Sequence, residues 1–275
     1  MIEVDVLRTR GRWPPPEGPR VAVVGSRRPT PYGEAVAERL AGDLAAAGVV
    51  VISGLALGVD AAAHAGALAA GGCTIAVLGT GVDVIYPAAH SDLARRIVDG
   101  GGALVSQFAD GTRPHRGNFP RRNWTIAALT DAVIVVEAAE GSGALITAEA
   151  ALAQQREVMA VPGSVFSPLS VGCHQLLRDG AALVQNARDV LAVLGQAGEV
   201  LDDPLRPPAS LGVAEPPGPD GLVKHLSESV PTGAGDLSRK LGLPFADVLR
   251  RLTALELAGR VKRHGSGYVR LTVRR

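Results

Sequence analysis

Short, continuously apolar runs recur along the chain from residue 20 onward, and longer segments with helical spacing of apolar positions separate them. Runs without alternation are typical of strands that a parallel sheet buries on both faces. The pattern therefore predicts an α/β fold with a doubly wound, mainly parallel sheet over residues 20–195. We expect strands at 20–24, 49–52, 74–78, 103–106, 132–137, 157–161 and 181–184. We expect helices at 32–47, 59–70, 91–99, 120–129, 144–155 and 187–194.

The segments on either side of this predicted domain have different patterns. Residues 1–19 are a short lead in which Trp13 is followed by three prolines that cannot continue a helix. Residues 196–219 are rich in proline and are expected to be a semi-rigid linker. Residues 220–275 contain three amphipathic segments and then a hairpin signal, which predicts a winged helix-turn-helix domain. The three segments are 221–229, 235–241 and 243–258, and the hairpin is 261–271.

Charge is distributed unevenly between the two predicted domains, although the net charge of the whole chain is only +1. Residues 220–275 carry 11 Lys and Arg against 5 Asp and Glu, a net charge of +6. Residues 1–219 carry 17 against 22, a net charge of −5, and contain no lysine. The C-terminal domain is therefore the one whose overall charge would attract nucleic acid.

The number and spacing of the cysteines and histidines argue against a disulfide-stabilised or metal-binding protein. The two cysteines, Cys73 and Cys173, are a hundred residues apart, so neither a zinc ribbon nor a disulfide framework is expected. The six histidines lack metal-binding spacing, and we expect no metal site. We also expect no signal peptide and no membrane span. Few cysteines fit a reducing compartment, so a cytoplasmic location is expected.

Loops rich in glycine and serine follow five of the predicted strands. Because the carboxyl ends of parallel strands share one edge of a sheet, these loops are expected to converge where ligands bind. Exposed backbone N–H groups, hydroxyl groups and helix N-termini all bind oxyanions, and Arg27 adds a charge that can hold a phosphate. We therefore predict a phosphate-containing ligand. The loops are 25–28, 53–60, 79–83, 140–144 and 162–164.

Two common phosphate-binding classes do not fit these loops. No segment matches the P-loop pattern, and its lysine has no counterpart in residues 1–219, so hydrolysis of ATP by a P-loop is excluded. The loop at 25–28 lacks the later glycines of the dinucleotide fingerprint, and no acidic residue ends the second strand. We therefore expect neither NAD nor any other cofactor.

A second cluster of candidate binding residues lies in residues 113–124, which contain four arginines, a histidine, Phe119 and Trp124. Arginine holds backbone phosphates and aromatic faces stack on unpaired bases, so this composition favours single-stranded nucleic acid as the ligand. The alternative is a solvated loop with the two aromatic side chains packed in the core. The predicted DNA- and phosphate-binding residues are Gly25, Ser26, Arg27, Ser53, Gly54, Ala56, Gly58, Asp60, Gly79, Gly81, Arg113, Arg116, Phe119, Arg121, Arg122, Asn123, Trp124, Gly141, Ser142, Gly143 and Thr147.

Six segments resemble, in the same order, the motif series of the DNA processing protein A family (DprA, also called Smf), over residues 4–195. They are 23–27, 53–64, 76–87, 119–123, 142–148 and 161–163. The resemblance implies an extended Rossmann fold, sequence-independent binding of single-stranded DNA and homodimerisation. It also implies protection of incoming DNA during natural transformation and its transfer to the RecA recombinase. The C-terminal domain resembles the winged-helix appendage of the family.

The sequence departs from the family pattern in four places. The helical domain that precedes the Rossmann fold in many members has no counterpart here. Ala88 follows Tyr86-Pro87 where a basic residue is common, Trp124 replaces an arginine and His174 replaces an asparagine. The changes at Ala88 and Trp124 suggest a pocket that depends less on charge and more on stacking.

Two other functions remain open. Residues 141–149 are similar to the glycine-rich loop of nucleoside-monophosphate phosphoribohydrolases, in which Glu149 could serve in glycosidic bond cleavage, although the other motifs favour a protein without catalytic residues. A transcription regulator could use the basic wing, although a docking role is favoured because the third helix of the C-terminal domain offers few base-reading side chains. Asp60 is expected to brace a loop or cap a helix, and His64 to pack within its helix.

Overall fold

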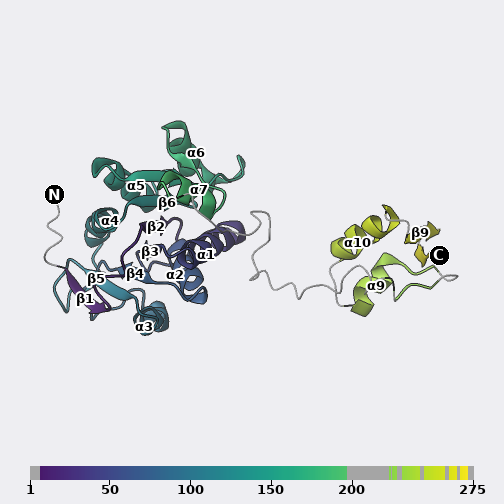
Figure 1. The fold of residues 1–275 in the computed structure, drawn as a ribbon, viewed down its shortest axis with the longest axis horizontal. Coiled ribbons are helices and arrows are strands. Elements are labelled where there is room, and N and C mark those ends of the chain that lie inside the picture. The colour runs from purple at the N-terminus through teal and green to yellow at the C-terminus, as the bar shows by residue number, and fades with distance from the viewer. Residues whose placement is uncertain are drawn as a thin grey trace. The chain divides into compact units, whose positions relative to one another are not determined.

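The computed structural model describes residues 7–196 continuously and, beyond them, residues 223, 225–227, 231–241, 245–257, 260–264 and 267–271. The chain divides into two compact units, one ending at Pro208 and the other beginning at Ala209. Figure 1 shows the helices and strands of both units.

An eight-stranded sheet forms the centre of the first unit, in the order β1-β5-β4-β3-β2-β6-β7-β8. Neighbouring strands are parallel except for β1, which pairs antiparallel with β5. The four strands β3, β4, β5 and β6 are short runs that are buried along their whole length, which confirms the predicted parallel α/β fold. The strands are β1 (Arg8–Gly11), β2 (Arg20–Val24), β3 (Val50–Ser53), β4 (Thr74–Val77), β5 (Ala103–Ser106), β6 (Ala132–Val135), β7 (Glu157–Ala160) and β8 (Ala182–Leu183).

Helices cover both faces of this sheet (Figure 1). Side chains alternate between the faces along β2: Val21 and Val23 pack against one helical layer, whereas Ala22 and Val24 pack against the other. The first layer consists of α1 (Pro31–Ala46), α2 (Val59–Ala69), α3 (Ser91–Asp99) and α7 (Ala187–Val193). The second layer consists of α4 (Asn118–Ala128), α5 (Gly143–Ala153) and α6 (Val171–Arg178).

The strand order reverses at β2. From β2 the chain proceeds outward through β3, β4 and β5, and α4 then returns it to β6 on the other side of β2. In doubly wound sheets, ligands bind at the carboxyl ends of the strands where the order reverses. The loops that follow β2, β3 and β6 meet at this position, and they are three of the five loops that the sequence predicts to bind phosphate.

The sequence pattern did not predict β1 or α6. β1 lies inside the predicted lead, so residues 8–11 belong to the sheet and the predicted boundary at residue 20 omits an edge strand. An edge strand has one unpaired side and tolerates polar residues, and β1 has the sequence RTRG, with no apolar run. The predicted strand at 132–137 ends at Val135, and buried loop residues follow it.

The second unit contains α9 (Ala234–Leu241), α10 (Phe245–Leu257) and an antiparallel pair formed by β9 (Val261–His264) and β10 (Gly267–Arg270). Its core includes Leu237, Leu252 and Tyr268. This order of helices and hairpin agrees with a winged helix, although the predicted helix at 221–229 lies mostly outside the described residues. None of the helices described in either unit is long and apolar enough to cross a membrane.

Candidate nucleic-acid interface

A buried carboxylate joins the loops that follow β2 and β6. Glu137 is 4% exposed, and its two oxygens accept hydrogen bonds from the backbone N–H of Thr30 at 2.8 Å and from the Thr30 hydroxyl at 2.6 Å. The same hydroxyl oxygen accepts a hydrogen bond from Gly33 N at 3.2 Å and so caps the N-terminus of α1. One side chain therefore fixes the loop that carries Arg27 relative to the loop after β6.

A second buried carboxylate braces the loop that follows β3. Asp60 is 6% exposed, and Oδ2 accepts hydrogen bonds from Gly54 N at 3.1 Å and Ala56 N at 3.2 Å, which confirms the predicted brace. Burial raises the pKa of Asp60, and the nearby Arg122 charge opposes this shift. Gly58 has a φ of +78°, and a Cβ there would lie 2.5 Å from the Ser26 carbonyl oxygen. Glycine at this position lets the loops after β2 and β3 touch.

Arg122 on α4 is buried at the centre of these loops, with 4% of its surface exposed. Nη1 donates hydrogen bonds to Val77 O at 2.7 Å and to Gly54 O, and Nε donates to Asn123 Oδ1 at 3.1 Å. Asn123 in turn donates from Nδ2 to Gly143 O at 3.0 Å. Burial lowers the pKa of Arg122, the Asp60 carboxylate opposes the shift and the Arg27 charge adds to it. Arg122 therefore ties the loops of three strands together.

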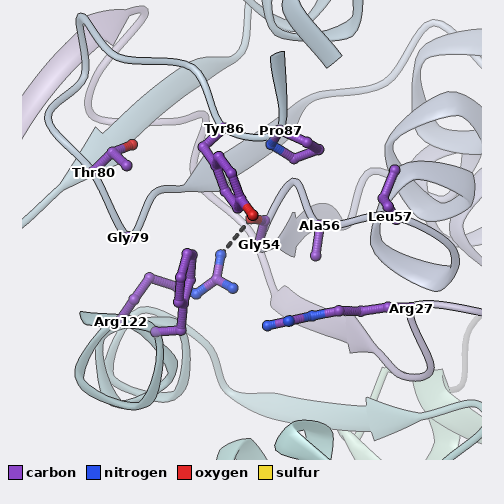
Figure 2. Close-up of a pocket in the computed structure, with 10 residues that line it drawn as sticks. Arg27, Gly54, Ala56, Leu57, Gly79, Thr80, Tyr86, Pro87 and Arg122 are labelled. Carbon is purple, nitrogen blue, oxygen red and sulfur yellow. Dashed lines mark hydrogen bonds between the residues drawn. The ribbon is translucent and has the colours of Figure 1, made fainter. Parts of the chain in front are cut away.

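A small pocket of about 90 Å³ opens above Arg122, with aromatic side chains on its wall (Figure 2). The Phe119 and Tyr86 rings lie 5.7 Å apart at 41°, and the Arg27 guanidinium carbon lies 5.6 Å from the centre of the Phe119 ring. Arg27 and Tyr86 are exposed, so a cation and an aromatic ring face solvent together. The pocket is lined by Arg27, Gly54, Ala56, Leu57, Gly79, Thr80, Tyr86, Pro87, Phe119 and Arg122.

A larger pocket of about 380 Å³ lies at the switch point between β2 and β6. The two pockets are adjacent, because both are lined by Arg27, Ala56 and Arg122. Its wall has backbone groups of two glycine-containing loops and the N-terminus of α5, where Ser142 Oγ accepts a hydrogen bond from Ala144 N at 3.3 Å. The lining residues are Val24, Gly25, Ser26, Arg27, Ala56, Asp60, Arg122, Asn123, Ile126, Ala139, Ser142, Gly143, Ala144, Thr147 and Leu169.

Most of the residues predicted from the sequence as phosphate or DNA ligands line one of these pockets. The predicted residues in the larger pocket are Gly25, Ser26, Arg27, Ala56, Asp60, Arg122, Asn123, Ser142, Gly143 and Thr147. Those in the smaller pocket are Arg27, Gly54, Ala56, Gly79, Phe119 and Arg122. Loops separated by more than a hundred residues in sequence therefore meet as the switch-point argument predicts.

The remaining predicted residues lie outside the two pockets: Ser53, Gly58, Gly81, Arg113, Arg116, Arg121, Trp124 and Gly141. Ser53 is fully buried, and its hydroxyl donates to Val23 O at 2.7 Å. The Arg121 guanidinium carbon lies 5.4 Å from the centre of the Phe108 ring. Trp124 is 39% exposed on α4, so it is not fully packed in the core, and its stacking on a base stays a prediction.

Glu137, Thr80 and Tyr86 belong to the site but are not among the residues that the sequence predicts for it. Tyr86 and Thr80 fall inside a segment that carries the family resemblance, which is the signal that could have identified them. Glu137 is the last residue of a predicted strand, and its burial and its hydrogen bonds to Thr30, which only the structure shows, distinguish it from a surface carboxylate.

Glu149, the residue of the alternative catalytic function, and His64 line neither pocket. Glu149 is exposed on α5. His64 is fully buried, its Nδ1 lies 2.7 Å from Thr74 Oγ1, and burial lowers its pKa to about 3, which confirms a packing role. Within the described ranges, no group of three or more His, Cys, Asp or Glu side chains is placed to hold a metal ion.

Comparison with known families assigns both parts of the chain. Residues 3–195 match the family described as DNA recombination-mediator protein A, and residues 206–267 match the DprA winged helix domain. The DNA processing protein DprA of Mycobacterium tuberculosis is 45% identical over 242 residues, which are 86% of this chain and 61% of that protein. Protein Smf of Escherichia coli is 41% identical over 257 residues, covering 92% of this chain and 68% of Smf.

Solved structures show the same relationship. DNA processing protein A from Streptococcus pneumoniae superimposes with a TM-score of 0.60 at 46% identity, covering 63% of this chain and 61% of that one. The Helicobacter pylori protein gives a TM-score of 0.63 at 31% identity, covering 70% and 88%. The chain thus spans about three fifths of the length of the Mycobacterium tuberculosis and Streptococcus pneumoniae relatives. Since the family match covers well over half of the chain, we conclude that it belongs to the DNA recombination-mediator protein A (DprA/Smf) family.

Proposed function

We propose that this chain binds single-stranded DNA, with little dependence on base sequence and without a cofactor or metal ion. The Helicobacter pylori relative has been described for its single-stranded DNA binding mode, and that description supports the same ligand here. The two pockets at the carboxyl edge of the sheet are the binding surface in this proposal.

The observation that carries the proposal is the contact of Arg27 with Phe119 and of Phe119 with Tyr86. A base can stack on an aromatic face whatever its identity, and a guanidinium beside that face can hold the adjoining phosphate. A duplex keeps its bases stacked on one another, so this arrangement favours an unpaired strand.

The larger pocket supplies the phosphate contacts of the proposed site. Its wall combines Gly25, Ser26 and Gly143 backbone with the start of α5, and the exposed Arg27 lies between the two pockets. Successive phosphates of one strand would then lie near glycine loops while the base between them enters the aromatic pocket.

In the cell, the proposed role is to protect incoming single strands in the cytoplasm and to load the RecA recombinase onto them, as a homodimer, during natural transformation and recombination. The description of the matched family as a recombination mediator supports this role. A protein that transfers a strand must hold it without reading its sequence, as backbone and stacking contacts do.

Binding titrations of the full chain with a single-stranded oligonucleotide, a blunt duplex and a nucleoside monophosphate test the proposal. We expect the single strand to bind most tightly, with similar affinity for different sequences and weaker binding as salt rises. Equal or tighter binding of the duplex would contradict it and favour a duplex-binding regulator.

The competing phosphoribohydrolase function has its own readout in the same titration. Release of free base from the nucleoside monophosphate, abolished by Glu149→Gln, would establish an enzyme instead. We expect no release, because Glu149 is exposed on α5 away from the pocket walls.

A further inference from the structure

The edge strand β1 presents a row of arginines. Arg8 pairs with Ser106 of β5 and Arg10 with Leu104, and Arg12 follows with its N–H donating to Gly102 O at 2.9 Å. Because alternate residues of a strand point to the same face, Arg8 and Arg10 lie on one side of the sheet, about 6.8 Å apart. Arg10 and Arg12 are exposed and Arg8 is half-buried. We call Arg8, Arg10 and Arg12 the edge row.

The edge row begins beside the smaller pocket. Ser106, the partner of Arg8, donates a hydrogen bond from Oγ to Thr80 O at 2.6 Å, and Thr80 lines that pocket. Phe108 N donates to the same Ser106 oxygen at 3.0 Å, and Arg121 lies over the Phe108 ring. Contacts through Thr80, Ser106 and Phe108 therefore link the pocket to Arg121 and to the backbone of Arg8 at the carboxyl end of β5.

The charges of the edge row are not neutralised by partners in the described part of the chain. None of the ion pairs found there involves Arg8, Arg10 or Arg12. The carboxylates of the neighbouring α3, Asp92 and Asp99, are both paired with Arg95. Two exposed arginines and one half-buried arginine, separated only by Thr9 and Gly11, fit a polyanion better than a folded protein surface.

We propose that the edge row binds successive phosphates of the single strand after the strand leaves the pocket at Thr80. The proposal rests on the proposed function and extends its binding surface along β1. The spacing of alternate strand residues is comparable with the distance between successive phosphates of an extended single strand, so each arginine can meet one phosphate. The contacts involve only the DNA backbone and add affinity without sequence preference.

The test compares Arg8→Gln/Arg10→Gln with a matched control, Arg178→Gln/Arg188→Gln, in the full chain. Arg178 and Arg188 are exposed on α6 and α7, outside the pocket walls, so the control removes the same charge elsewhere. Each protein is titrated with a strand of about 5 nucleotides, enough for the pockets, and with one of about 20 nucleotides.

We expect the edge-row variant to bind the long strand about tenfold more weakly at low salt, with its salt slope reduced by about 1.4 for two lost phosphate contacts. Affinity for the short strand should be unchanged, and the control should match the parent protein on both strands. Circular dichroism and thermal unfolding verify that all the variants fold.

Three results would overturn the edge row as a DNA track. Unchanged affinity for the long strand would show that the strand does not follow β1. An equal loss for both strands would show that the arginines act on the pocket itself. Self-association of the variant with DNA binding unchanged would show that the arginines only protect an open sheet edge from pairing. Failure of the parent protein to bind either strand would instead refute the proposed function, and the track with it.

Discussion

Arg27 and Arg122 differ in how much of their hydrogen-bonding capacity a ligand can use. Arg27 is exposed and lies over Phe119, whereas Arg122 is 4% exposed and donates from Nη1 to two backbone carbonyls. Both residues line the pockets, so we expect both to affect binding, but for different reasons. Arg27 can contact the ligand directly, and Arg122 mainly holds the walls of the site.

Replacing Arg27 should therefore weaken DNA binding without weakening the fold. We expect Arg27→Ala to lose about 1.5–3 kcal/mol of binding free energy, which is a loss of one charge-assisted contact. The neighbouring Arg28 is exposed and lines neither pocket, so Arg28→Ala is the control and should bind almost normally. Fluorescence anisotropy with a labelled single strand measures both. Equal losses in the two variants would mean that only overall charge matters.

Replacing Arg122 should weaken the fold itself. Arg122→Met keeps much of the side-chain volume but leaves Gly54 O and Val77 O without their donor and Asp60 without its nearby positive charge. We expect the free energy of unfolding to fall by about 3 kcal/mol, the cost of breaking a buried charged network. Arg121→Met, at the adjacent exposed position on the same helix, should cost under about 1 kcal/mol. Urea unfolding distinguishes them, and similar midpoints for the two variants would contradict the role assigned to Arg122.

This pair also illustrates what the sequence can predict about the site. Arg121 and Arg122 are adjacent in a basic cluster of the sequence. Nothing in that local pattern distinguishes an arginine that contacts DNA from one that holds the loops of the site together. Burial decides the difference, and burial depends on loops from β3 and β4 that are distant in sequence. Asp60 was predicted as a brace because an acidic residue at the start of a helix usually satisfies nearby N–H groups. Glu137 has no comparable local signal.

At the scale of elements, the site depends on how the loops after β2 and β6 are joined. Glu137 accepts both hydrogen bonds from Thr30, so the loop that carries Arg27 is fixed at one point only a few residues away. In Glu137→Gln, one carboxylate oxygen becomes an NH₂ group that cannot accept a hydrogen bond from the Thr30 hydroxyl.

We expect Glu137→Gln to lower the affinity for single-stranded DNA several-fold, because the Arg27 loop is less well positioned, and to cost about 1–2 kcal/mol of stability. Glu140→Gln removes the same charge from an exposed position in the same loop and serves as the control. Removing an acidic charge near a DNA site should by itself improve binding slightly, as in the control. Tighter binding in both variants would therefore show that Glu137 contributes only its charge.

The elements that the sequence predicts well are those with strong internal patterns. β3 and β6 are continuous apolar runs, and the structure ends them within two residues of the prediction. β1 was not predicted because its residues, RTRG, are not apolar and its pairing with β5 depends on a segment almost a hundred residues away. α6 is short, with eight residues, and little of it is fully buried, so its period is hard to detect.

At the scale of the whole molecule, the net charge favours DNA binding by the C-terminal unit, whereas the geometry of the pockets favours DNA binding by the first unit. We expect the basic C-terminal unit to attract DNA at long range, since residues 220–275 have a net charge of +6 and residues 1–219 a net charge of −5. The pockets, the aromatic contacts and Arg27 all belong to the first unit. Long-range attraction governs the rate of association, whereas short-range contacts decide how long the strand stays bound.

A truncation that ends at residue 196 separates these contributions. We expect residues 1–196 to bind single-stranded DNA on their own, because the residues that line both pockets lie within this range. Association should be slower than in the full chain, and the salt dependence of affinity weaker, because the basic unit is gone. Stopped-flow and equilibrium titrations at two salt concentrations measure both effects, and circular dichroism verifies that the truncated chain folds. If it folds but binds no single strand even at low salt, then the C-terminal unit is the main DNA-binding element, and the pockets at the sheet edge serve another ligand.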